Sequence, residues 1–275
     1  MIKTFYIIDT VNYRDLAVES VRSLFKDDEL KTLLDITFLY PGESLPPDFA
    51  LAGEPGVTDQ VYSEDCIPEE AKRMQQVIYS HNTETYTAHH LAGSEKTTPW
   101  HRYHFLQNGF DLYIDCDLFF VRPEVFRQCL FKATSKGLYM FPEIFITAHK
   151  KPKWLKKMES PKPYFSTAII LNNGGSRVIQ RFLQTMERLY FKHFRTMKFA
   201  LDQGLLNLFN MQSIQTLIHP LQLSIAYIVP EKDVTPDTII HEDPGKEIDI
   251  IHLIGDKKKW DRVTQMEKLS KLGTN

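Results

Sequence analysis

The ten residues from Tyr113 to Arg122 constrain the fold of this chain more than any other segment. Asp115 and Asp117 lie there between two short apolar segments, of which the second runs from Leu118 to Val121. Such apolar, aromatic segments predict buried strands that end or begin at the acidic pair. Residues i and i+2 of an extended chain project on the same side, so both carboxylates can reach one hard cation. Taken alone, the triplet would also fit a solvated turn between two strands.

Strands and helices alternate through most of the chain. The segments expected to be strands are Lys3 to Ile8, Ile36 to Tyr40, Gly137 to Phe141, Tyr164 to Leu171, Ile214 to Ile218, Ser224 to Val229 and Ile248 to Leu253. Helical spacing predicts helices over residues 17–25, 68–81, 86–106, 178–190 and 201–209, and a short helix from Pro123. The order predicts an α/β fold with a mixed, mostly parallel sheet flanked by helices. Pro41 to Gly56 is expected to be a loop.

Length and charge limit the classes of function. At 275 residues and 43% hydrophobic, the chain can build one sizeable domain over residues 1–275. A formal charge of -2 gives no global attraction to nucleic acid, which we do not expect as a partner. Three cysteines without a Cys-x-x-Cys pair suggest a reducing compartment. No apolar stretch approaches the roughly 20 residues of a membrane span, so a cytoplasmic protein is expected.

Three further segments accompany the acidic pair. Thr10-Val11-Asn12-Tyr13 follows the first strand, at the strand end where open α/β sheets place ligands. Strand Tyr164 to Leu171 is followed later by Asp202-Gln203-Gly204, at the start of an expected helix. The last segment is His252-Leu253-Ile254-Gly255-Asp256-Lys257-Lys258-Lys259-Trp260.

These segments together resemble glycosyltransferase family 8, retaining enzymes that include bacterial lipopolysaccharide galactosyl- and glucosyltransferases and glycogenin. The resemblance runs in order from about Phe5 to Trp260. It implies a single-domain A-type glycosyltransferase fold with a Rossmann-like nucleotide-sugar-binding half (about residues 1–122). A donor-sugar and acceptor half (about 123–260) and a C-terminal helix or tail (261–275) would follow. The implied reaction moves a hexose, galactose or glucose, from a UDP-sugar to a saccharide or glycolipid acceptor.

The resemblance implies a metal site at Asp115, Asp117 and His252. Two carboxylates and one imidazole suit Mn²⁺ better than Ca²⁺, and Mg²⁺ is also compatible. A divalent cation would stabilise the charge that develops on the diphosphate leaving group. Gly255 would allow close backbone approach to a phosphate, and Lys258 would offer an ammonium group to it. Without the resemblance, His252 would fit a half-buried strand end, and the lysines a solvated run.

The nucleotide would be bound near the first strand. By resemblance, Thr10 and Asn12 would contact the uracil and ribose, and Tyr13 would stack on the base. Tyr13 could instead only pack beneath the following helix. Arg102 matches a family arginine that reaches the diphosphate or donor sugar. A surface arginine on a helix would fit the sequence as well. Cys116, between the two aspartates, belongs to the same expected site.

The donor sugar would lie near Asp202 and Gln203, the two expected catalytic residues. By resemblance, Asp202 contacts the sugar hydroxyls and Gln203 lies beneath the anomeric carbon, which implies front-face attack. Double displacement remains open, and Asp202 could be only a helix cap. The family usually has asparagine in the segment that reads Tyr164-Phe165-Ser166-Thr167-Ala168 here, so Ser166 takes a donor-contact position. Together with Gly204, where an acid is common, this leaves the sugar open.

The segment His149 to Lys157 contains five lysines and one tryptophan. It could be a solvated loop. It could also contact a glycolipid acceptor or an anionic membrane through residues Lys150 to Lys157, which would put the protein at the inner face of a membrane.

Two other functions fit parts of the sequence. A metal-dependent nucleotidyltransferase would use a similar sheet but expects a glycine-rich loop after the first strand, and Asp9 to Tyr13 has no glycine. A non-catalytic sugar-nucleotide or glycan-binding module would keep the pocket without turnover.

Overall fold

Two β-sheets organise the computed structural model of this chain, which describes residues 1–8, 11–42, 55–67, 69, 72–73, 100–143, 162–193, 202–228, 239–241 and 245–253. The larger sheet has seven strands in the order β3-β2-β1-β4-β7-β6-β8, and the smaller has four in the order β10-β9-β11-β5. The strands are β1 (Ile2–Ile7), β2 (Leu34–Pro41), β3 (Val57–Tyr62), β4 (Leu112–Ile114), β5 (Leu118–Phe120), β6 (Gly137–Met140), β7 (Ile169–Asn173), β8 (Ile218–Pro220), β9 (Ile225–Ile228), β10 (Ile239–His241) and β11 (Ile250–Leu253). The described helices are α1 (Val11–Leu24), α2 (Asp28–Leu33), the 3-10 turn η2 (Glu64–Cys66), α4 (His101–Gln107), α5 (Pro123–Lys132), α8 (Ser176–His193) and α9 (Asp202–Gln212).

The large sheet is mixed and mostly parallel, as the sequence predicted. Strands β3, β2, β1 and β4 are parallel to one another, β7 is antiparallel to both of its neighbours, and β6 is parallel to β8. The carboxyl ends of β1, β2 and β4 therefore meet at one edge of the sheet, the edge that favours ligand binding in such folds.

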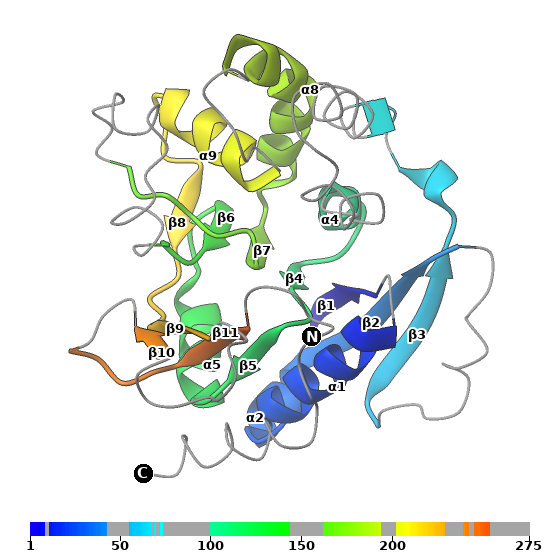
Figure 1. Cartoon of the computed structure of the whole chain (residues 1–275), viewed down its shortest axis with the longest axis vertical. Helices are drawn as coiled ribbons and strands as arrows, with labels where there is room; N and C mark the ends of the chain where they lie inside the picture. The colour runs from blue at the N-terminus through cyan, green and yellow to red at the C-terminus, as the bar shows by residue number, and fades with distance from the viewer. Residues whose placement is uncertain are drawn as a thin grey trace.

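Helices cover both faces of this sheet (Figure 1). Alternate side chains of β1 and of the residue after it lie in two different cores. Phe5 and Ile7 belong to the core that includes α4, α8 and α9, whereas Tyr6 and Ile8 belong to the core that includes α1, α2 and α5. This division follows from the two-residue period of a strand. The smaller sheet has its own cluster, which contains Phe119, Ile228, Ile251 and Leu253.

The two sheets are joined where β4 passes into β5. β4 lies inside the large sheet, between β1 and β7, whereas β5 pairs antiparallel with β11 in the small sheet. The three residues between them, Asp115 to Asp117, therefore lie at the junction, as Figure 1 shows for the two strands.

Several expected elements differ from the structure. The strand expected from Tyr164 begins only at Ile169. Before it, Phe165 forms an isolated bridge with Pro142, and its backbone N–H and C=O hydrogen-bond with the Asn207 side chain. The strand expected at Ile214 begins at Ile218, and Ile214 itself is fully exposed after the end of α9. Within the described residues, the helix expected over 86–106 is seen as α4, and the rest of that range lies outside them.

Four of the described elements were not expected: α2, β3, η2 and β10. The short helix α2 begins after Asp27, whose carboxylate caps it by accepting from Leu30 N at 3.0 Å. Strand β3 pairs in parallel with β2 at the edge of the sheet.

Candidate functional site

The segment between β4 and β5 is fixed at each of its three residues. Asp115 N donates to Ala168 O (2.8 Å), the Cys116 thiol lies on Ile7 O (3.2 Å), and Leu253 N donates to Asp117 O (3.0 Å). These contacts come from three different strands or their ends. The Cys116 side chain points into the core and is 5% exposed, while the aspartates project from the segment.

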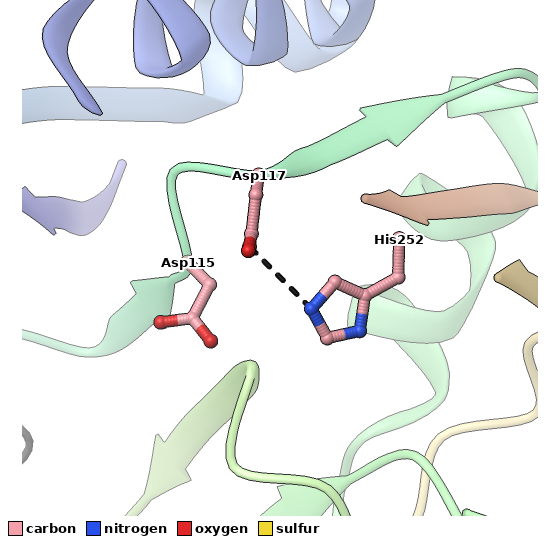
Figure 2. Close-up of side chains that lie close together, drawn as sticks. All are labelled: Asp115, Asp117 and His252. Carbon is pink, nitrogen blue, oxygen red and sulfur yellow. Dashed lines mark ion pairs between the residues drawn. The ribbon is translucent and has the colours of Figure 1, made fainter. Parts of the chain in front are cut away.

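His252 reaches the acidic pair because β11 pairs with β5. In this register His252 is the partner of Leu118, next to Asp117. Its Nε2 lies 3.5 Å from Asp117 Oδ1, and one ligand atom from each of Asp115, Asp117 and His252 can be chosen so that all lie within 4.8 Å of one another. Figure 2 shows the three side chains pointing toward a common space. We call these three residues the metal triad.

The donor set of the metal triad fits a divalent cation. Two carboxylate oxygens and one imidazole nitrogen match the ligands that Mn²⁺ accepts. Burial raises the pKa of Asp115; Arg102 lowers it and the charge of Asp117 raises it, leaving a net upward shift. A cation at this site would therefore compete with protons for Asp115.

Arg102 lies inside the protein beside the metal triad, so the interpretation as a surface arginine is wrong. It is 8% exposed, its guanidinium lies over the Tyr113 ring at 4.5 Å, and it donates to Thr167 O at 2.8 Å. Its nitrogens lie 3.8 Å from Asp115 Oδ1 and 3.6 Å from Asp202 Oδ2. Burial lowers the pKa of Arg102, but Asp202 and other neighbours raise it by more. The net shift is upward, so the guanidinium stays charged.

Arg102 thereby connects the metal triad to the start of α9. Asp202 is the first residue of that helix and is 3% exposed. The Tyr103 hydroxyl donates to its Oδ2 at 2.8 Å. Burial raises the pKa of Asp202, and the charge of Arg102 opposes that shift. Asp202 therefore acts as the buried partner of Arg102 and Tyr103.

Gln203 is half-buried and faces the end of β6. Its Nε2 donates to Glu143 Oε2, and Thr167 Oγ1 donates to its Oε1 at 3.4 Å. The nearby Ser166 is 2% exposed, and its hydroxyl accepts from Ala168 N at 3.3 Å. Asn207, one turn along α9, donates to Gln203 O (2.8 Å) and holds residue 165 in place.

Of the remaining expected site residues, the structure describes only the side chain of Tyr13. Tyr13 is partly buried and packs against the core that contains α1. Thr10, Gly255 and Lys258 lie outside the described residues, and so does the side chain of Asn12. Their expected contacts stay predictions.

Sequence reasoning missed Glu143. It follows β6 after Phe141 and Pro142, and it is 5% exposed. An acid just past the carboxyl end of a buried strand is a signal for a site residue, and this signal was present in the sequence. Its partner Gln203 lies 60 residues further on, a pairing that spacing alone could not reveal.

Several solved structures with a similar fold are glycosyltransferases. They include a galactosyltransferase, LgtC, in complex with donor and acceptor sugar analogues (13% identity, 99% of this chain and 95% of that chain, TM-score 0.52). Mouse xyloside xylosyltransferase 1 is similar over 95% of this chain and 99% of its own (11% identity, TM-score 0.57). The bifunctional glycosyltransferase WbbM is similar over 93% of this chain but 46% of its own length (15% identity, TM-score 0.53).

These similarities establish the fold. No protein-family model matches the sequence, and no curated protein is similar to it in sequence. At identities of 11 to 15%, the chain shares the A-type glycosyltransferase fold with these structures, as the sequence predicted.

Proposed function

We propose that this protein is a retaining, metal-dependent hexosyltransferase. It would move galactose or glucose from a UDP-sugar to a saccharide or glycolipid acceptor. The observation that carries the proposal is the convergence of Asp115, Asp117 and His252 at the junction of two sheets, in a fold shared with glycosyltransferases.

A cation held by the metal triad would supply positive charge to the diphosphate leaving group. The side chains around the triad support this use. Arg102 adds a second, permanent positive charge within 3.8 Å of Asp115, and its own position is fixed by Asp202 and Thr167. An anionic diphosphate is the ligand that such a pair of charges would favour.

The donor sugar is proposed to lie beside Gln203 and Ser166. The Gln203 amide is the half-buried polar group at the start of α9, whereas Asp202 is occupied with Arg102 and Tyr103. We therefore propose that Asp202 acts on the donor through Arg102. The uridine is proposed to meet Thr10, Asn12 and Tyr13, and the phosphates to meet Gly255 and Lys258.

The acceptor could be presented at a membrane surface. None of the described helices is both long and apolar enough to cross a membrane. The five lysines of residues 149–157 lie outside the described residues, and we propose that they contact an anionic acceptor or membrane.

Changing Lys153, Lys156 and Lys157 to Gln tests this contact. The apparent acceptor KM should rise while acceptor-free UDP-sugar hydrolysis stays nearly unchanged. The difference should shrink in high salt, since exposed charges are screened over roughly 8 Å at physiological ionic strength. Loss of both activities would instead assign the segment to the donor site or the fold, and no change in either would leave it a solvated loop.

A screen of UDP-sugars for slow hydrolysis tests the proposed function, because hydrolysis needs no acceptor. UDP-galactose and UDP-glucose should be cleaved with Mn²⁺ and spared in excess chelator. The anomeric configuration of the sugar transferred to a trial acceptor, read by NMR, tests retention. Absence of metal-dependent cleavage for every UDP-sugar would refute the proposal.

A further inference from the structure

Glu143 is a buried carboxylate that joins two parts of the site. One oxygen accepts from Gln203 Nε2, and the other accepts from the Tyr227 hydroxyl at 3.5 Å. The residue is 5% exposed and lies just after β6, in the large sheet, whereas Tyr227 lies in β9 of the small sheet. The carboxylate, which follows a strand of the large sheet, is therefore held by helix α9 and by the small sheet.

This contact sets the orientation of the Gln203 amide. An ionised carboxylate only accepts hydrogen bonds, so the amide nitrogen must face Glu143 and the carbonyl oxygen must point away from it. Thr167 Oγ1 donates to that carbonyl oxygen at 3.4 Å. A hydroxyl could also accept from an amide N–H, so Thr167 fits either orientation and it is Glu143 that fixes the amide.

The position of Glu143 is also connected with the metal triad. The ring of Tyr227 lies beside that of His252, with 5.5 Å between the ring centroids. Tyr164 is also buried, and both burial and the charge of Glu143 raise the pKa of its hydroxyl. Glu143 is thus linked to His252 through Tyr227, and its charge also acts on Tyr164.

We infer that Glu143 is a positioning residue: it holds the Gln203 amide so that the carbonyl oxygen, and not the NH₂ group, faces the reacting donor sugar. The inference rests on the proposed function. When the bond between the anomeric carbon and the phosphate oxygen breaks, its electron pair leaves with the diphosphate and the carbon becomes positive. The negative end of a fixed carbonyl dipole stabilises that carbon, whereas an N–H group in its place would oppose the reaction.

The variant Glu143→Gln tests this role, because it keeps the shape of the side chain and removes the constraint. A glutamine at 143 can donate as well as accept, so the Gln203 amide can adopt both orientations. In acceptor-free hydrolysis with Mn²⁺, kcat should fall at least about tenfold while the KM for the UDP-sugar stays within about twofold. The matched control is Glu124→Gln, the same change at an exposed acid of α5, which should leave both constants unaltered.

A second measurement reads the amide itself and does not depend on turnover. In protein labelled with ¹⁵N-glutamine, the side-chain signals that vanish in Gln203→Leu belong to Gln203. One of its two amide protons should be shifted downfield and protected from exchange in the native protein. Both effects should be lost in Glu143→Gln and kept in Glu124→Gln.

The two measurements separate failure of the inference from failure of the proposed function. Native kcat in Glu143→Gln, or Gln203 signals unchanged by that substitution, would overturn the inference alone. A glycosyl adduct on Glu143, detected by mass spectrometry, would overturn it too by making the residue a nucleophile. If the native protein cleaves no UDP-sugar, the proposed function fails and the reaction role of Glu143 fails with it, whatever the amide signals show.

Discussion

At the scale of single residues, the site depends on two carboxylates with different surroundings. Asp115 lies beside Arg102, whereas Asp117 lies beside His252 and is 8% exposed. A cation held by the metal triad would take a carboxylate oxygen of Asp117 as one of its ligands, together with Asp115 and His252.

Replacing Asp117 with Asn should therefore reduce metal-dependent turnover by about a hundredfold, since removing one charge-stabilising element costs about 3 to 4 kcal/mol in the transition state. The Kd for Mn²⁺, measured by calorimetry, should rise in parallel. Asp111→Asn is a matched control: this aspartate precedes β4 and accepts from Lys3 N (3.0 Å), away from the metal triad. Near-native turnover in Asp117→Asn would contradict the metal assignment.

A second residue-scale prediction concerns His101, at the start of α4. It is 3% exposed, its Nδ1 lies 2.7 Å from the Tyr62 hydroxyl, and burial lowers its pKa to about 4. The unfolded chain, with a pKa near 6.5, binds a proton more readily than the folded protein between pH 6.5 and 4. Stability therefore falls as pH falls through that window.

Between pH 7 and pH 5 this residue should lower the free energy of unfolding by about 2 kcal/mol. Urea unfolding of the native protein and of His101→Gln at both pH values measures the effect, because glutamine keeps a polar side chain but does not titrate. The pH dependence of the variant should be weaker by that amount. Equal pH dependence in the two proteins would contradict the prediction, because it would mean that the pKa of His101 is the same in the folded and unfolded states.

The sequence predicted site residues best where the relevant spacing was local. Asp115 and Asp117 follow from their positions two apart between apolar strands. His252 could be placed beside them only through the family resemblance, because their contact depends on the pairing of β11 with β5, more than 130 residues apart in numbering. Tyr13 packs against the core that contains α1, and its stacking on a base stays a prediction.

At the scale of elements, buried apolar strands were easier to predict than strands at the edge of a sheet. β1, β2, β6, β9 and β11 were found from continuous apolar segments because they are buried on both faces. β3 was missed because Val57 to Tyr62 alternates between more and less exposed positions and contains polar residues. Its strand conformation comes from pairing with β2, which no local pattern reports.

The attachment of α9 to the segment before β7 gives an element-scale prediction. Asn207 is fully buried; its Oδ1 accepts from Phe165 N (2.7 Å), and its Nδ2 donates to Phe165 O (2.7 Å) and Gln203 O (2.8 Å). Asn207→Ala leaves these buried backbone groups without partners, so the free energy of unfolding should fall by about 2 to 4 kcal/mol.

Asn173→Ala provides the comparison for Asn207→Ala. Its Nδ2 donates to Ala133 O (2.8 Å) and Ser135 O (3.0 Å), but the residue is only half-buried, so water can replace the lost bonds. The free energy of unfolding of Asn173→Ala should therefore fall by about 1 kcal/mol or less. Urea unfolding of both variants measures the difference, and equal losses would show that burial of Asn207 is not what makes α9 depend on it.

At the scale of the whole molecule, the site lies where two sheets meet. Asp115 and Asp117 belong to the segment between β4 of the large sheet and β5 of the small one, and His252 comes from β11 of the small sheet (Figure 1, Figure 2). Arg102 and Asp202 join this junction from α4 and α9. A ligand that binds the triad and Arg102 together would therefore contact elements from both sheets, and its binding should stabilise the molecule as a whole.

The last prediction uses that coupling. UDP with Mn²⁺, at about 100 times its Kd, should add about 2.7 kcal/mol to the free energy of unfolding and raise Tm by roughly 5 to 10 °C. UDP or Mn²⁺ alone should raise Tm less, because each would contact only part of the site.

Asp117→Asn should lose the part of the Tm shift that requires Mn²⁺, and Asp111→Asn should keep it. If ADP or GDP raises Tm as much as UDP does, the site binds a diphosphate without preferring uridine. If the Mn²⁺-dependent part survives in Asp117→Asn, the cation that binds UDP lies elsewhere than between the two sheets.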